Sequence, residues 1–165
     1  MPEISHSQTD MYLRLIDEHS PLIYKVCYMY SEDSEHLKDL YQEVLANLWQ
    51  GLDGYMNRAK PSTWIYRVAI NTCITYFRRH GKHSDVARID EAMLGIVDEN
   101  HEHAEQLRQM YEMIAQLGKL DRAIIMLWLD EHSYDEISDV TGLSRNNVAS
   151  RLYRIKQRLM KLNDE

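Results

Sequence analysis

Apolar residues recur at helical spacing along almost the whole chain, and this periodicity is the strongest constraint on its fold. From Leu37 to Trp49 they occur at offsets 0, 3, 4, 7, 8, 11 and 12, which places them on one face of a helix. The chain has six glycines and three prolines, and no segment alternates β-branched with polar residues as a half-buried strand does. The pattern therefore predicts an all-α protein.

The apolar spacing predicts a helix over each of several segments. Gly51 and Gly54 are expected to end the second, and Pro61 to open the third, where its fixed φ and missing N–H are tolerated. Pro21 marks a point at which the first helix can bend. In chain order, the predicted segments are residues 10–30, 33–50, 61–79, 104–117 and 121–131, then a short helix between Ser133 and Gly142 and a long helix that follows Ser144.

A segment between the predicted helices is strongly acidic. Residues 85–105 contain seven acids and one base and show little helical periodicity, so they are interpreted as a linker with at most a short helical turn. The predicted organisation is two small helical domains, residues 8–83 and 106–163, joined by an acidic linker, residues 84–105.

Basic residues gather in two segments that contain no acid. Residues 54–84 hold six Lys or Arg, and residues 144–163 hold six more. The remaining 114 residues carry a charge of −19, so the net charge of −7 hides two basic surfaces on an acidic body. Such surfaces suit a polyanion. Two solvated helix faces are the alternative interpretation.

The second basic segment follows a helix-turn signature. Ser133 and Glu136 have the S-x-x-E spacing of a capping box. Gly142 is expected to end that short helix, Leu143 to fill the turn and Ser144 to cap the next helix. A short helix, a glycine turn and a long basic helix are typical of a helix-turn-helix. A plain helical hairpin with a basic face is the alternative.

The long helix is amphipathic, with an apolar side and a polar side. The residues predicted to be buried are Val148, Leu152, Ile155 and Leu159. Those predicted to face away from them are Asn147, Ser150, Arg151, Arg154, Arg158 and Lys161. On a recognition helix, the first residues reach base edges in the major groove, and later arginines meet phosphates.

The first basic segment contains a second helix with a polar stripe. The stripe consists of Trp64, Arg67, Asn71, Thr75 and Arg78, and Tyr55 precedes it. Aromatic rings that stack, amides that bond base edges and arginines that hold the backbone together suit unstacked single-stranded bases. Aromatic residues such as Trp64 and Tyr66 are more often part of a core, and this alternative stays open.

The predicted helix over residues 33–50 has its own polar face. That face carries Asp39, Gln42, Glu43 and Asn47. It is either a solvated helix face or a surface that docks on a basic partner.

Several other features exclude whole classes of protein. Cys27 and Cys73 lie 46 positions apart without a CxxC spacing, which excludes a disulfide scaffold or zinc finger and fits a reducing cytoplasm. The longest stretch without charge is ten residues, against about 20 for a membrane-spanning helix, and no secretory signal is readable. The pairs His101/His103 and His80/His83 lack metal-site spacing, and no phosphate-binding loop or nucleophile elbow is present. We therefore expect no metal, no cofactor, no catalytic residue and no membrane insertion.

Two blocks of sequence resemble a known family. DLYQEVLANLWQ (39–50) with PSTWIYRVAINTCITYFRR (61–79) resembles region 2 of the extracytoplasmic-function (ECF) group of bacterial RNA polymerase sigma factors. SYDEISDVTGLSRNNVASRLYRIKQRLMKL (133–162) resembles their region 4. The blocks stand in the expected order, and with their spacing they cover about 150 of the 165 residues.

The resemblance implies a promoter-specificity subunit with a region 2 helical bundle and a region 4 helix-turn-helix. Its implied partners are promoter DNA and core RNA polymerase, through the clamp helices of the largest subunit and the flap of the second-largest; an anti-sigma factor is left open. The implied −35 duplex residues are Arg145, Asn146, Asn147, Ser150, Arg151, Arg154 and Arg158. The implied −10 single-strand residues are Tyr55, Lys60, Trp64, Arg67, Asn71, Thr75, Arg78 and Arg79. The implied polymerase-binding residues are Asp39, Gln42, Glu43 and Asn47.

Two positions depart from the family's pattern. Thr75 stands where the family often has an acid, which makes its helix more basic. Asn146 and Asn147 replace a common Gly-Thr, which leaves the −35 preference open because Asn favours adenine contacts. A stand-alone helix-turn-helix regulator is the alternative function, although residues 8–83 show no α/β pattern or acidic pocket for a ligand or phosphoacceptor domain. A nucleic-acid enzyme is a third possibility, but no carboxylate cluster lies beside the basic segments.

Overall fold

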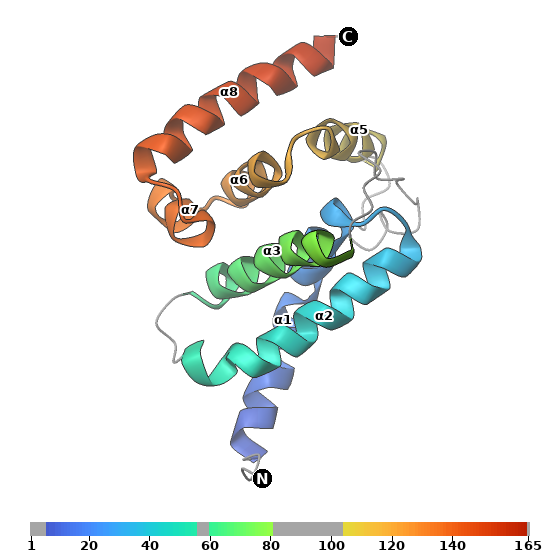
Figure 1. The fold of residues 1–165 in the computed structure, drawn as a ribbon, viewed down its shortest axis with the longest axis vertical. Helices are drawn as coiled ribbons and strands as arrows, with labels where there is room; N and C mark the ends of the chain where they lie inside the picture. The colour runs from blue at the N-terminus through green and yellow to red at the C-terminus, as the bar shows by residue number, and fades with distance from the viewer. Residues whose placement is uncertain (1–5, 56–59, 81–103, 165) are drawn as a thin grey trace.

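Helices make up almost all of the described chain, in a computed structural model that describes residues 6–55, 60–80 and 104–164 (Figure 1). The described residues contain no strand, which confirms the all-α prediction. The helices are α1 (His6–Tyr30), α2 (Ser34–Tyr55), α3 (Pro61–His80), α5 (Ala104–Ala115), α6 (Lys119–Leu129), α7 (Tyr134–Thr141) and α8 (Arg145–Asp164).

The N-terminal half, α1 to α3, is a three-helix bundle in which each helix packs against the other two. The predicted apolar face of α2 is confirmed, since Leu37, Leu40, Val44 and Leu48 are buried. Asp33 caps this helix, because its Oδ1 accepts a 2.8 Å hydrogen bond from the His36 N–H. Lys60 precedes α3, with Pro61 at its first position as predicted.

Two predicted helix boundaries are wrong by four or more residues, whereas the others agree within about two residues. Helix α1 begins four residues earlier than expected and runs through Pro21, which is exposed. Helix α2 does not end at its glycines but continues to Tyr55. Glycine inside a helix costs about 0.5–1 kcal/mol, whereas Leu52 and Tyr55 are both buried in the last turn. Burial of large side chains therefore overrides the local preference.

The C-terminal half, α5 to α8, contains the helix-turn-helix. Its capping box is confirmed, because the Glu136 N–H donates to the Ser133 hydroxyl and the Glu136 carboxylate accepts from the Ser133 N–H. Gly142 ends α7 in the left-handed region at φ 76°, which only glycine adopts without strain. Ser144 caps α8 through a 3.2 Å hydrogen bond from the Asn147 N–H.

The two halves pack directly on each other. Helix α3 lies against α6 and α7, and α1 contacts α5 (Figure 1). Buried apolar side chains of both halves form one continuous cluster. Sequence periodicity predicted the two helical units but carried no signal for this packing.

Two further predictions meet the described residues only in part. The acidic linker lies almost entirely outside them, although α5 already begins at Ala104, inside the predicted linker. The histidine pairs also lie outside the described side chains. Among the helices that the structure describes, none is both long and apolar enough to cross a membrane.

Candidate nucleic-acid interface

Helix α3 presents a polar stripe along its solvent side. Arg67, Asn71 and Thr75 are exposed, whereas Ile65, Ala69 and Cys73 on the opposite side are completely buried. The Arg78 and Arg79 side chains lie outside the described residues. Arg67, Asn71 and Thr75 of the predicted stripe therefore face solvent together.

Trp64 differs from the rest of this stripe. Its ring stacks on Tyr55 with centroids 4.5 Å apart and planes 22° apart. Tyr55 is buried, which raises its pKa above the ordinary tyrosine value. Trp64 also lies near Gly51, where an added Cβ would be 3.5 Å from its ring. This geometry favours the core interpretation of both aromatic residues.

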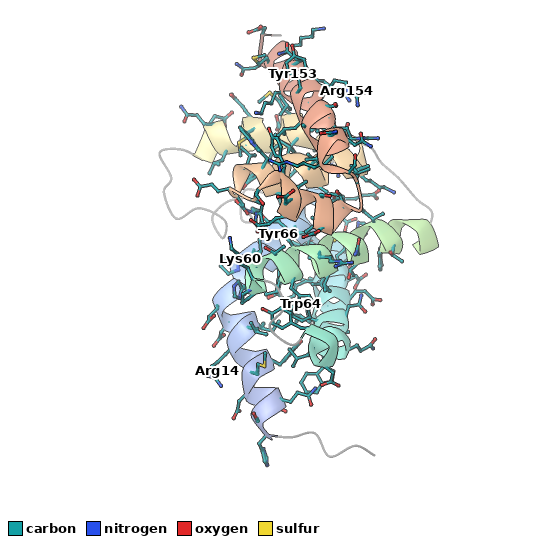
Figure 2. The ribbon with its side chains drawn as sticks, turned by 90° about the vertical axis from the view of Figure 1, so that its left-hand side faces the viewer. Arg14, Lys60, Trp64, Tyr66, Tyr153 and Arg154 are labelled. Carbon is teal, nitrogen blue, oxygen red and sulfur yellow. The ribbon has the colours of Figure 1, made fainter. Side chains whose placement is uncertain are left out.

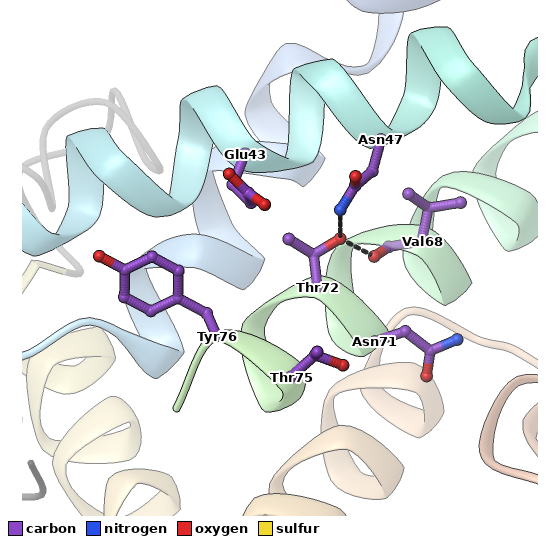
Figure 3. Close-up of a pocket in the computed structure, with 7 residues that line it drawn as sticks. All are labelled: Glu43, Asn47, Val68, Asn71, Thr72, Thr75 and Tyr76. Carbon is purple, nitrogen blue, oxygen red and sulfur yellow. Dashed lines mark hydrogen bonds between the residues drawn. The ribbon is translucent and has the colours of Figure 1, made fainter. Parts of the chain in front are cut away.

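A pocket of about 340 Å³ lies between α2 and α3 (Figure 3). Its floor is fixed by the Asn47 amide, which donates a 2.9 Å hydrogen bond to the Thr72 hydroxyl. Thr72 in turn donates to the Val68 carbonyl oxygen at 2.6 Å. The residues that line the pocket are Glu43, Asn47, Val68, Asn71, Thr72, Thr75 and Tyr76.

The rim of this pocket is acidic on the α2 side. Burial raises the pKa of the Tyr76 hydroxyl, and the charges of Asp39 and Glu43 raise it further. Both carboxylates are exposed, as is Gln42. Asn47 instead is half-buried and held by Thr72, which gives this residue a structural role in the described chain. The predicted polymerase face and the predicted −10 stripe thus meet at one pocket.

Helix α8 presents the predicted recognition face in the C-terminal half. Val148, Leu152 and Ile155 are buried against α6 and α7. The exposed polar residues are Arg145, Asn146, Asn147, Ser150, Arg154 and Arg158.

The arginines of α8 fall into two groups. Arg151 is half-buried and donates a 2.9 Å hydrogen bond to the Asp121 carboxylate of α6. Arg158 donates to the Gln116 carbonyl oxygen at 3.3 Å, whereas the exposed Arg154 side chain points outward beside them (Figure 2). A cavity of about 160 Å³ lies among these three arginines. Sequence reasoning missed Asp121, since nothing in its local sequence indicates a partner 30 residues away.

Sequence reasoning also missed an exposed apolar strip next to the predicted recognition face. Tyr153 and Met160 are 66% and 54% exposed, and on the helical wheel they lie about 60° and about 80° beyond Ser150, the residue at the edge of the polar arc. Lys156 lies between Tyr153 and Met160 in the sequence, and its ammonium is 3.9 Å from the centroid of the Trp128 ring on α6. A helical wheel would have shown that these two apolar residues lie outside the arc of buried residues.

Charged residues also link the two halves. The Thr63 hydroxyl of α3 donates a 2.9 Å hydrogen bond to the Glu136 carboxylate of α7, and the Lys60 ammonium lies 3.6 Å from the same carboxylate. Asp130 accepts hydrogen bonds from the Lys25 ammonium and the Tyr66 hydroxyl. The described residues contain no group of three or more His, Cys, Asp or Glu that could hold a metal ion.

Family models match both halves of the chain. Residues 15–83 match the model described as Sigma-70 region 2, and residues 107–159 match the model described as Sigma-70, region 4.

Relatives of known function cover most of the chain. The ECF RNA polymerase sigma-E factor of Escherichia coli strain K12 is 31% identical over 137 residues, which are 75% of this chain and 72% of that protein. The ECF RNA polymerase sigma factor SigW of Bacillus subtilis is 23% identical over 172 residues, which are 96% of this chain and 92% of that protein.

Two solved structures share the fold over nearly the full length. One is the sigma factor RpoE in complex with the anti-sigma factor NepR from Bartonella quintana, with a TM-score of 0.74 and 17% identity over 97% of this chain and 98% of that chain. The other is CnrH in complex with the cytosolic domain of CnrY, with a TM-score of 0.67 and 17% identity over 94% of this chain and 89% of that chain. Both likenesses extend across both halves.

Proposed function

The chain belongs to the ECF group of RNA polymerase sigma factors and directs promoter-specific initiation of transcription, and from this premise we propose which described surfaces perform each step. This family assignment is adopted in place of the alternative function, a stand-alone helix-turn-helix regulator. The N-terminal half corresponds to sigma region 2 and the C-terminal half to region 4.

Helix α8 is proposed to read the −35 element in the major groove. Asn146, Asn147 and Ser150 lie at its exposed N-terminal end, the end that reaches base edges in helix-turn-helix proteins. Arg154 follows one turn later, where a guanidinium contacts either a base edge or a phosphate. Arg151 already pairs with Asp121, so its contribution to DNA binding is smaller than that of Arg154.

Helix α3 is proposed to hold the melted −10 strand. Its exposed Arg67, Asn71 and Thr75 offer one cation and two hydrogen-bonding groups on a helix with no acid. The pocket beside Asn71 has two amides, hydroxyls, the Tyr76 ring and the Glu43 carboxylate on its walls. Those groups suit an unstacked base. Trp64 supports the helix from beneath through its stack on Tyr55.

The exposed carboxylates of α2 are proposed to dock on the clamp helices of the polymerase largest subunit. Asp39 and Glu43 point away from the buried Leu40 and Val44. Complementary charge across such an interface favours specificity and association rate. The Tyr153 and Met160 strip is proposed to contact the flap of the second-largest subunit, since it is apolar and lies outside the DNA-facing arc.

An anti-sigma factor is proposed as a further partner class. The support is the fold shared with RpoE, whose structure is a complex with NepR.

The observation that carries the proposal is the polar face of α8, exposed on a helix whose opposite side is the buried core of a capped helix-turn-helix. The test is to assemble the chain with core RNA polymerase and to select bound fragments from genomic DNA. A shared −35 and −10 motif is expected among the fragments, with enrichment lost on Arg154→Ala. Fragments without a shared motif would contradict the assignment.

A further inference from the structure

An internal carboxylate occupies the N-terminus of the helix assigned to the −10 strand. Thr63, which is only 8% exposed, donates its hydroxyl hydrogen bond to Glu136 at 2.9 Å. The Lys60 ammonium lies 3.6 Å from the other oxygen of that carboxylate. Lys60 lies at the left end of α3 in Figure 2, next to the C-terminal helices.

The first turn of α3 is built to receive an anion. The first backbone hydrogen bond of α3 runs from the Trp64 N–H to the Lys60 carbonyl oxygen. The N–H groups that precede Trp64 in the first turn therefore have no partner within the helix, and the helix dipole adds positive potential there. Residues 54–84 contain no acid that would compete for this position. The Glu136 carboxylate is stabilised in its charged form at this position. Burial alone would raise its pKa, but the hydrogen bonds from Thr63 and Ser133 and the charge of Lys60 outweigh burial and leave the pKa below its ordinary value.

A second carboxylate of the C-terminal half makes a similar contact nearby. Asp130, at the C-terminal end of α6, accepts from the Lys25 ammonium and from the Tyr66 hydroxyl. Tyr66 also meets His132 edge to face, with centroids 5.1 Å apart. Two acids of the C-terminal half therefore hold cationic and hydroxyl groups of the N-terminal half.

The packed arrangement cannot serve both promoter elements at once. Element centres 25 base pairs apart are separated by about 85 Å along straight duplex. Helix α8 has 20 residues and is about 30 Å long, and it follows α7, which touches α3. A chain held in this arrangement therefore cannot place α8 at one element and α3 at the other.

We propose that Glu136 occupies the position on α3 that a backbone phosphate of the −10 strand takes, so that the packed chain and the DNA-bound chain exclude each other. This inference rests on the proposed function of α3. Phosphate oxygens and a carboxylate present the same acceptors to Lys60 and Thr63. The packed chain is a closed form, and DNA binding requires the halves to separate.

The test compares a charge-removing variant with a matched control in the full chain. Glu136→Gln with Asp130→Asn removes both contacts, and Gln preserves the capping box. Glu112→Gln with Asp139→Asn removes the same charge at two exposed positions. Spin labels are attached at Arg14→Cys and Gln157→Cys, which are both exposed and lie on opposite halves, so the distance between them reports separation of the halves. The native cysteines are fully buried and are not expected to be labelled.

The wild type and the control are expected to give one narrow distance distribution, and the Glu136/Asp130 variant a broader distribution that extends to longer distances. DNA binding is measured with a fluorescein-labelled 20-nucleotide mixed-sequence single strand at low salt. If the closed form holds about nine in ten molecules, opening raises the apparent affinity about tenfold, because only the open fraction binds. Lys60→Ala in the open variant is then expected to reduce the affinity again.

A distance distribution in the wild type as broad as that of the Glu136/Asp130 variant, or an equal gain in affinity for the control, would overturn the inference while leaving the proposed function intact. An open variant that gains no affinity would overturn the exclusion of DNA. If Arg67→Ala and Asn71→Ala in that open variant also change nothing, the −10 role of α3 fails as well.

Discussion

The hydroxyl of Tyr30 donates a 2.7 Å hydrogen bond to the backbone carbonyl oxygen of Lys119, across the boundary between the two halves. The Tyr30 ring is 1% exposed, and the Arg122 guanidinium lies 5.3 Å from its centroid. Arg122 itself donates to the carbonyl oxygens of Met29, Ala115 and Leu117. One arginine thus satisfies carbonyls at the ends of α1 and α5, which would otherwise be left without partners.

Replacing Arg122 with Leu is expected to lower the free energy of unfolding by about 2–4 kcal/mol, since hydrogen bonds to charged groups contribute about 1.5–3 kcal/mol each and are not fully additive. Urea denaturation followed by circular dichroism measures the change. Arg108→Leu is the control, because Arg108 forms an exposed pair with Glu105 in α5 and should cost less than about 1 kcal/mol. Equal losses for both variants would show that Arg122 has no special role at the junction.

The native thiols are expected to react slowly. Cys27 and Cys73 are fully buried, and burial, with the neighbouring Cys27 thiol, raises the Cys73 pKa well above its ordinary value. Because the thiolate is the reactive form, a raised pKa and lack of access both slow the reaction. Ellman's reagent at pH 8 should modify neither cysteine within minutes in native buffer, but both in guanidinium chloride. Rapid modification of the native protein would contradict the packing of α1 on α3.

Local signals explain what the sequence could predict, and the length of the chain between contact partners explains what it could not. The Ser133 and Glu136 box and the Gly142 turn were readable because every partner lies within a few residues. Thr63 and Glu136 are 73 residues apart, and neither has a local feature that points to the other.

The predicted helix end at Gly51 failed for a related reason. Glycine is a local signal against a helix, but the stack of Tyr55 on Trp64 is a tertiary contact that keeps the last turn of α2 in place. The same stack changes the interpretation of Trp64, whose exposure could not be judged from spacing alone. Helical periodicity therefore predicts which face is buried better than it predicts the partner on that face.

Reversing the charge of the α2 face should weaken assembly with core polymerase. Asp39→Arg with Glu43→Arg changes two exposed carboxylates, so folding should be unaffected, while like charges against a basic surface cost several kcal/mol. Binding is measured by gel filtration and by competition for core enzyme, with helical content checked by circular dichroism. Glu18→Arg with Glu112→Arg, both exposed and on other helices, is the control for charge. Normal assembly of the Asp39/Glu43 variant would move the docking face elsewhere.

The arginines of α8 should contribute unequally to duplex binding. Arg154→Ala removes an exposed guanidinium and is expected to cost about 1–3 kcal/mol if it contacts a base, or a smaller, sequence-independent amount if it contacts phosphate. Arg151→Ala should cost less in binding, because Asp121 already neutralises that guanidinium. Holoenzyme binding to promoter duplex at several salt concentrations separates the two cases. An Arg151 effect larger than the Arg154 effect would show that the pair with Asp121 breaks on DNA.

Asn71→Ala should slow promoter opening while leaving duplex binding nearly normal. Asn71 is exposed at the rim of the pocket between α2 and α3, so its amide can reach an unstacked base but not one inside a closed duplex. Losing about 1 kcal/mol from the opened complex slows opening about fivefold. Stopped-flow fluorescence of a labelled −10 base measures opening, and filter binding at low temperature measures the closed complex.

A template already mismatched over the −10 region decides the step at which Asn71 acts. The variant is expected to recover most of its activity on this template, because melting no longer has to be driven by the captured base. Gln50→Ala removes an exposed amide from α2 and should behave like the wild type on both templates. Trp64→Ala is a poorer probe, since loss of the stack on Tyr55 would destabilise the bundle itself. A folded Asn71→Ala chain that opens at the normal rate, or that gains nothing from the mismatched template, would remove the single-strand role from this stripe.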